Sequence, residues 1–279
     1  MSDDTHNYLL ELNKRFAETY GRFDVLPKFK LPVFEPIVTI RPLTPVVGIT
    51  QIGNAFQAMQ DRMAEIFKPF TGLQEALERL PPQIRMAVSQ LASHGWFVSG
   101  EMPQRQMIEW GEMLQAGHVE KVDAILCSFF ESRIASIREK FEATLTDRFT
   151  IIDAAIQAHE NGQYVLSVPV FLAQADGVCH ARIQASPFRK QGRGKTDLAT
   201  GKWVDKSPSK WLDAFISPLK EAAPIAQTEN ERGKGFTGLN RHAVLHGEDV
   251  SYGSKLNSFK ALSLLVYIDH FVRPHECRE

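Results

Sequence analysis

Hydrophobic residues recur at helical spacing along most of the chain. Apolar positions three or four residues apart mark the ranges 50–67, 73–80, 84–91, 104–116, 119–143, 149–159, 164–183 and 211–219, and a shorter amphipathic pattern marks 1–22. Proline and glycine punctuate these ranges. The pattern therefore predicts an all-α protein.

Two further helices are predicted near the end of the chain, one at 239–246 and one from Lys255 onward, with a short polar loop between them. Gly247 stands where a left-handed residue ends a helix, and Ser254 stands where a side-chain oxygen starts the next one. The second helix carries a broad apolar face, whose members are Leu256, Phe259, Ala261, Leu262, Leu265 and Ile268.

The range 164–183 is apolar nearly all round, which predicts a central, buried helix paired with 149–159. Asp176 lies within it, and a buried carboxylate is unfavourable unless it is paired. Two interpretations stay open. Asp176 either bonds locally beside Gly177, or pairs with Arg241 or a neighbouring histidine and orients it.

Prolines divide the chain. Five of them break the helical pattern between residues 24 and 47 and predict an extended arm, either a linker or an arm that reaches a second subunit. We therefore predict an N-terminal helical region at 1–118, which carries this arm, and a helical domain at 119–279.

Composition narrows the class of protein. A net charge of −1 argues against a chain that coats nucleic acid, so any RNA contact must come from a local patch. Three cysteines are too few for a disulfide framework, and the N-terminus lacks the pattern of a secretory signal. No apolar run is long enough to cross a bilayer. The expectation is a cytoplasmic protein without a membrane segment.

One segment, 188–211, departs from this charge balance, with seven Lys or Arg against two Asp. Its Gly-Lys-Thr triplet lacks the preceding glycine and strand of a nucleotide-binding loop. The segment is either a solvated loop or a basic flap for single-stranded RNA, with Trp203 and Trp211 available for stacking. The candidate RNA-binding residues are Arg189, Lys190, Arg193, Lys195 and Lys202.

The stretch Arg241-His242-Ala243-Val244-Leu245-His246 resembles the R-x(4–6)-H motif of the HEPN superfamily. Members of that superfamily are helical, usually dimeric, and in many cases metal-independent ribonucleases. The resemblance implies a HEPN-like helical bundle, a homodimer, and a bacterial toxin or phage-defence endoribonuclease that cuts tRNA or mRNA and leaves 2′,3′-cyclic phosphate ends. An antitoxin or other regulatory partner would fit that role.

The motif residues suit this chemistry. Imidazole can donate and accept protons at neutral pH, and guanidinium holds phosphate oxygens while staying charged. Carried over from the family, His246 is the acid/base, Arg241 the phosphate clamp, and His242 and Asn240 position them. One Arg and one His are few groups for such a reaction. Two copies of the chain that meet at a two-fold axis would supply two of each.

Other functions compete with this one. The chain could be a catalytically inactive HEPN-type module that binds nucleotides or RNA or mediates dimerisation, or a helical regulator of another enzyme. Metal binding by His242 and His246 lacks a third ligand at a recognisable spacing, and we expect no metal or cofactor. Catalysis requires Arg241 and His246 of both subunits to converge on one solvent-accessible cleft. A structural role would bury His246 in apolar contacts or turn it away from the two-fold axis.

Overall fold

The computed structural model describes residues 79–191, 197–207, 209–220, 223–233 and 235–273. The predicted helices at 1–22 and 50–67 and the Pro-rich arm at 24–47 lie outside these residues. None of the helices in the described part of the chain combines the length and hydropathy that a bilayer crossing requires.

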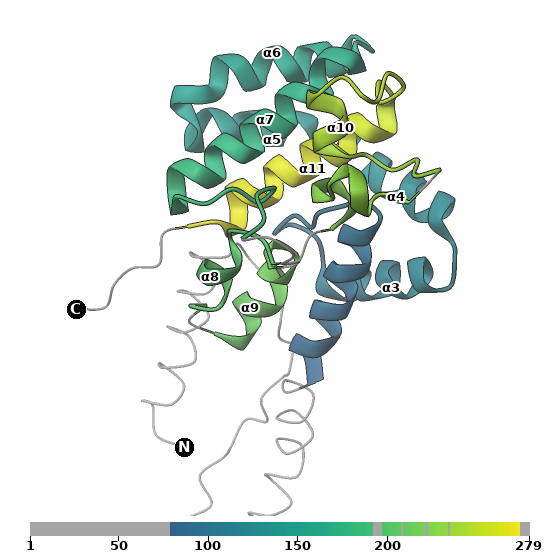
Figure 1. The fold of residues 1–279 in the computed structure, drawn as a ribbon, viewed down its shortest axis with the longest axis vertical. Helices are drawn as coiled ribbons and strands as arrows, with labels where there is room; N and C mark the ends of the chain where they lie inside the picture. Colours follow the sequence, from purple (N-terminus) through teal and green to yellow (C-terminus); the bar gives the residue numbers. More distant parts are fainter. Residues whose placement is uncertain (1–78, 192–196, 208, 221–222, 234, 274–279) are drawn as a thin grey trace, which may run out of the picture. The chain divides into compact units, whose positions relative to one another are not determined.

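The described residues fold into helices, most of them joined by short turns, with longer connections before α8 and α10 (Figure 1). A helical segment at 79–93 comes first. It is followed by α3 (Gln104–Gln115), α4 (Val119–Glu131), α5 (Ile134–Thr144), α6 (Phe149–Glu160), α7 (Tyr164–Ile183), α8 (Gly201–Val204), α9 (Lys210–Ile216), α10 (Arg241–Leu245) and α11 (Lys255–Phe271). The only bridge among these residues joins Lys190 to Leu198, and no strand forms. The all-α prediction is confirmed for the described residues.

The centre of the fold is α11, which α4, α5 and α7 all contact (Figure 1). Every residue from Ser258 to Asp269 is buried, including the charged Asp269. That carboxylate accepts a hydrogen bond of 2.7 Å from Nη2 of Arg182 on α7. The pairing offsets the loss of hydration that a buried charge suffers.

The prediction that α7 is a central, buried helix is confirmed in part: α7 packs against α6, α10 and α11, but one side of it is exposed. Its inner face, which includes Val168, Phe171 and Leu172, is buried, but Val165 and Leu166 are more than half exposed. The near-uniform apolar composition of α7 concealed this outer face. α11 is the more completely buried of the two helices, and its polar residue Asp269 has a partner inside the core.

Pro169 explains how the loop before α11 is attached to α7. Proline has no N–H, so the carbonyl of Val165, four residues earlier, has no donor within the helix. The hydroxyl of Tyr252 donates to that carbonyl at 3.0 Å. The loop that follows α10 is thereby held against the first turn of α7.

Residues on both sides of the predicted boundary at 118/119 share one hydrophobic core. The ring of Trp96 stacks on Phe130 of α4 at 5.9 Å, and its indole nitrogen donates to Asp123 at 2.6 Å. Within the described residues, the boundary therefore does not separate two cores.

Candidate active site at helix α10

Asn240 anchors the start of α10. Its side-chain oxygen accepts from the backbone nitrogen of Ala243 at 2.9 Å, as expected of an N-cap. Its amide nitrogen donates to the carbonyls of Pro224 and Gln227, at 2.8 and 2.9 Å. With 1% of its surface exposed, Asn240 fixes the helix on the turn η3 (Pro224–Ala226). Its role is therefore to hold the start of α10 in place.

Arg241 pairs with Asp176, which is one of the two interpretations that the sequence left open. Nη2 of Arg241 donates to the Asp176 carboxylate at 3.1 Å. The second carboxylate oxygen accepts from the hydroxyl of Ser186 at 2.6 Å. The guanidinium also lies over the ring of Phe188, 5.4 Å from its centroid. The pair joins α10 to α7 and orients the guanidinium.

The two motif histidines lie together. Their ring centroids are 4.2 Å apart with the planes tilted by 48°, as the i, i+4 spacing predicts. His246 is the C-cap of α10 and is exposed to solvent. His246 is therefore accessible to a substrate, as catalysis would require.

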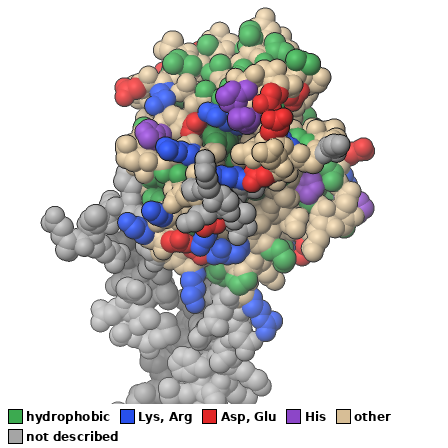
Figure 2. Space-filling model, viewed as in Figure 1, with side chains coloured by type: hydrophobic (Ala, Val, Ile, Leu, Met, Phe, Trp, Pro, Cys, Tyr) green, Lys and Arg blue, Asp and Glu red, His purple; other side chains and the backbone are tan. Residues whose placement is uncertain are grey.

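Two charged residues complete this cluster and were not singled out from the sequence. Glu248 lies with one carboxylate oxygen 3.5 Å from Nε2 of His242, and with the other 2.6 Å from Nη2 of Arg232. The hydrogen bond from Arg232 holds the pKa of the Glu248 carboxyl below its usual range. A space-filling view shows histidines, carboxylates and basic side chains gathered over α10 (Figure 2).

The metal alternative gains no support from the geometry. No group of three His, Cys, Asp or Glu side chains within the described ranges is arranged to hold a metal ion. The acid–base and electrostatic groups of this site are imidazole, guanidinium and carboxylate.

The basic segment is more ordered than a simple loop. It contains α8 and the start of α9, and it buries Leu198 and Val204 in the core. Trp203 and Trp211 pack against that core, and the indole nitrogen of Trp203 donates to the carbonyl of Arg273 at 3.1 Å. Neither ring is freely presented for base stacking.

The candidate RNA-binding residues differ in their availability. Arg189 and Lys202 are exposed, whereas Lys190 is bound to Glu231. That contact and the backbone N–H of Thr228 lower the pKa of Glu231 to about 2. Arg193 and Lys195 lie outside the described residues.

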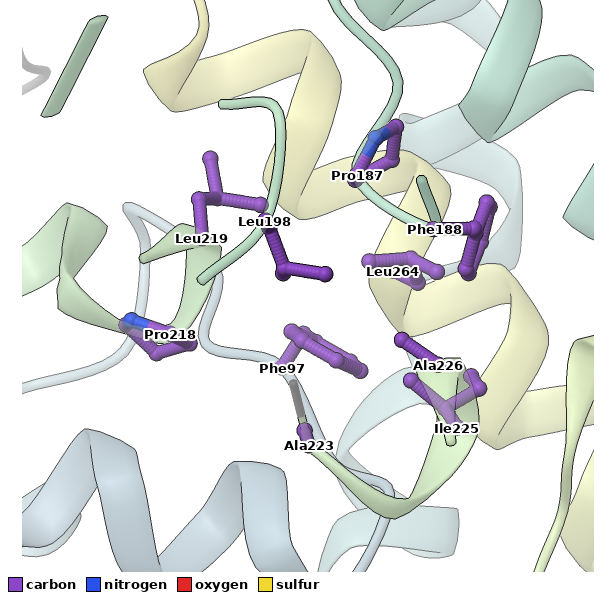
Figure 3. A pocket seen from close by; sticks show the side chains of 10 residues that line it. All are labelled: Phe97, Pro187, Phe188, Leu198, Pro218, Leu219, Ala223, Ile225, Ala226 and Leu264. Atoms are coloured by element: carbon purple, nitrogen blue, oxygen red, sulfur yellow. The ribbon is translucent and has the colours of Figure 1, made fainter. Parts of the chain in front are cut away.

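A small cavity lies under Phe188, between α11 and the basic segment (Figure 3). Phe97, Leu198 and Leu264 contribute to its apolar wall. The cavity has room for roughly one water molecule. It is therefore a packing defect beneath the site and cannot hold a nucleotide.

No family model, curated protein or solved structure matches the chain. The candidate site consequently rests on its own geometry.

Proposed function

We propose that the chain has a HEPN-like fold and is a metal-independent endoribonuclease that acts through Arg241, His242 and His246. The observation that carries the proposal is the combination found on α10. The first residue of the helix is a guanidinium oriented by Asp176, and beside it His242 contacts the exposed His246.

These groups supply what metal-free RNA cleavage needs. One imidazole removes the proton from the 2′-hydroxyl, while another protonates the departing 5′-oxygen. Arg241 neutralises the charge that develops on the phosphorus oxygens. The product of this attack is a 2′,3′-cyclic phosphate, and no metal ion or cofactor takes part.

A homodimer would bring two such sets together. Leu245 and Val250 on and after α10, and Val165 and Leu166 at the start of α7, are large exposed hydrophobics. Tyr252 joins the two regions through the carbonyl of Val165. Apolar side chains exposed beside a polar site favour a protein partner, and a two-fold axis there would pair the sites.

The substrate would be tRNA or mRNA, guided by Arg189 and Lys202 of the basic segment. A toxin or phage-defence role, restrained by an antitoxin or regulatory partner, fits such an activity. Expression would then arrest growth, and the arrest would depend on His246.

The decisive experiment is cleavage of a mixed tRNA and mRNA pool in EDTA by the wild type, His246→Ala and His118→Ala, at matched dimer content. His118 is an exposed histidine next to α4 and serves as the matched control. We expect the wild type and His118→Ala to leave cyclic-phosphate ends and His246→Ala to leave the RNA intact. A wild-type dimer that cuts none of the pool would contradict the proposal.

A catalytically inactive module for RNA or nucleotide binding is the second candidate. The observation that favours it is that Arg241 and Arg232 are each paired with a carboxylate, which reduces their availability to phosphate. Such a module would bind the same RNA with equal affinity in the wild type and in His246→Ala, without cleavage by either.

A further inference from the structure

Glu248 lies three residues beyond the end of α10, yet its carboxylate returns to the first turn of that helix. The cause is Gly247, whose φ of 72° turns the chain back. The backbone nitrogens of Glu248 and Asp249 then both donate to the carbonyl of Ala243, at 2.9 and 3.1 Å. This reversal places the Glu248 side chain beside His242.

The two carboxylate oxygens of Glu248 have different partners. One accepts from Arg232 at 2.6 Å, and the other lies 3.5 Å from Nε2 of His242. The ring of His242 in turn packs on His246 at 4.2 Å. A continuous chain of contacts therefore leads from Arg232 through Glu248 and His242 to the exposed imidazole.

We propose that Glu248 is a positioning residue for the histidine pair, and that it determines which nitrogen of His242 carries the proton. A carboxylate can only accept, so it favours a proton on the Nε2 atom that faces it. His242, oriented in this way, forms the surface against which the His246 ring packs. The catalytic part of this inference rests on the proposed RNA cleavage.

The surrounding charges agree with this role. Arg232 neutralises Glu248, and Asp176 is neutralised by Arg241, so neither carboxylate presents an unbalanced charge to a phosphate. The carboxylate of the remaining acid of the loop, Asp249, accepts a hydrogen bond from the backbone nitrogen of Ser251 at 2.7 Å.

Stability does not explain the contact between Glu248 and His242. Both side chains are about two-fifths exposed, and contacts between charged groups at such positions contribute little to folding. What the contact does is restrict the orientation of one ring, which matters for proton transfer.

The test compares Glu248→Gln with Asp249→Asn, which removes the same charge one residue further along the loop. The ¹⁵N spectrum of the His242 ring, recorded where imidazoles are neutral, reports the tautomer, and kcat and KM for RNA cleavage report the reaction. In Glu248→Gln we expect a smaller Nε2–H fraction and a kcat lower by about tenfold or more, with KM changed less than about twofold. Asp249→Asn should match the wild type in both.

The outcomes separate the two proposals. An unchanged His242 spectrum in Glu248→Gln overturns the positioning role, even where the wild type cleaves RNA. An unchanged kcat in Glu248→Gln, with an altered spectrum and an active wild type, also overturns it. A changed spectrum with a wild type that cleaves no RNA leaves the contact established and overturns the cleavage proposal.

Discussion

The guanidinium of Arg241 lies 3.1 Å from the carboxylate of Asp176, which ties the first residue of α10 to the middle of α7. The two residues are 65 positions apart in the sequence. Both side chains are about one-quarter exposed, so a phosphate can approach the same guanidinium that Asp176 orients. The pair serves positioning more than stability.

Replacing Asp176 by Asn tests this distinction. We expect the free energy of unfolding in urea to fall by about 1 kcal/mol, because partly exposed ion pairs contribute no more than this. RNA cleavage should fall by about tenfold or more, because Arg241 loses its fixed orientation.

Asp153→Asn is the matched control, since Asp153 pairs with Arg138 at 2.5 Å and is exposed to a similar degree. It should lose comparable stability and keep full activity. Equal losses of activity in the two variants would contradict a positioning role for Asp176.

Gly247 and Gly162 form a natural comparison. Both follow a helix with a left-handed φ, of 72° and 73°, and a Cβ on either would meet nothing within 4 Å. An alanine at either position therefore costs only backbone strain, about 1–2 kcal/mol. Because Gly247 also places Glu248, Gly247→Ala alone should lower RNA cleavage. The measurements are thermal unfolding and the rate of RNA cleavage for both variants. An equal fall in the cleavage rate of Gly247→Ala and Gly162→Ala would contradict this expectation.

Asn240 is expected to contribute more to stability than an ordinary N-cap. Ser254 at the start of α11 makes one capping bond, to the backbone nitrogen of Asn257, and Ser254→Ala should cost about 1 kcal/mol. Asn240→Ala loses a similar bond, leaves the carbonyl of Gln227 without its donor, and removes one of the two donors to the carbonyl of Pro224, so about 3 kcal/mol is expected. Urea unfolding of the two variants checks the difference, and equal losses would show that the turn η3 is held by other contacts.

Local chemistry explains which features could be predicted from the sequence. The helices 149–159 and 164–183 were predicted within one residue of α6 and α7, and Gly247 and Ser254 were recognised as end and start signals. Such features depend on residues that are near neighbours in the chain, and their propensities act before any tertiary contact.

Features that depend on distant residues could not be predicted in the same way. Composition alone did not show that α11 is buried on nearly all sides while α7 has one exposed side. That difference depends on which polar groups find partners inside the core. The role of Arg232 depends on Glu248, sixteen residues later, and only the turn at Gly247 brings that carboxylate back. Glu248 itself carried a local signal, since a residue just after a left-handed helix end returns to the last turns.

The basic segment makes a prediction about salt. In a His246→Ala background that prevents cleavage, Arg189→Ala and Lys202→Ala should each weaken single-stranded RNA binding. Each should also reduce the slope of log affinity against log salt by about 0.7, the value for one phosphate contact. Lys121→Ala, an exposed lysine of α4, is the control and should change neither. Slopes that match the wild type in all three variants would place the RNA elsewhere.

His159 should make stability depend on pH. Only 5% of its surface is exposed, its ring packs 4.4 Å from Phe259, and its Nδ1 lies 2.7 Å from the hydroxyl of Ser258. Burial, together with the charge of Lys255, lowers the pKa of His159 from 6.5 to about 4.

The folded state therefore favours the neutral ring. Its contribution to stability is complete above about pH 6.5, where the unfolded chain is also neutral, and is lost as the pH falls towards 4. The loss amounts to about 3 kcal/mol at most.

The measurement is the free energy of unfolding at pH 7 and pH 4.5 for the wild type, His159→Gln and His118→Gln. His159→Gln should be less stable at pH 7 but lose less stability on acidification, because glutamine has no group that the unfolded chain protonates more readily than the folded protein. His118→Gln, at an exposed position, should follow the wild type, and the carboxylates that all three proteins share cancel in the comparison. Equal acid sensitivity in the wild type and His159→Gln would show that the pKa of His159 is the same in the folded and the unfolded protein.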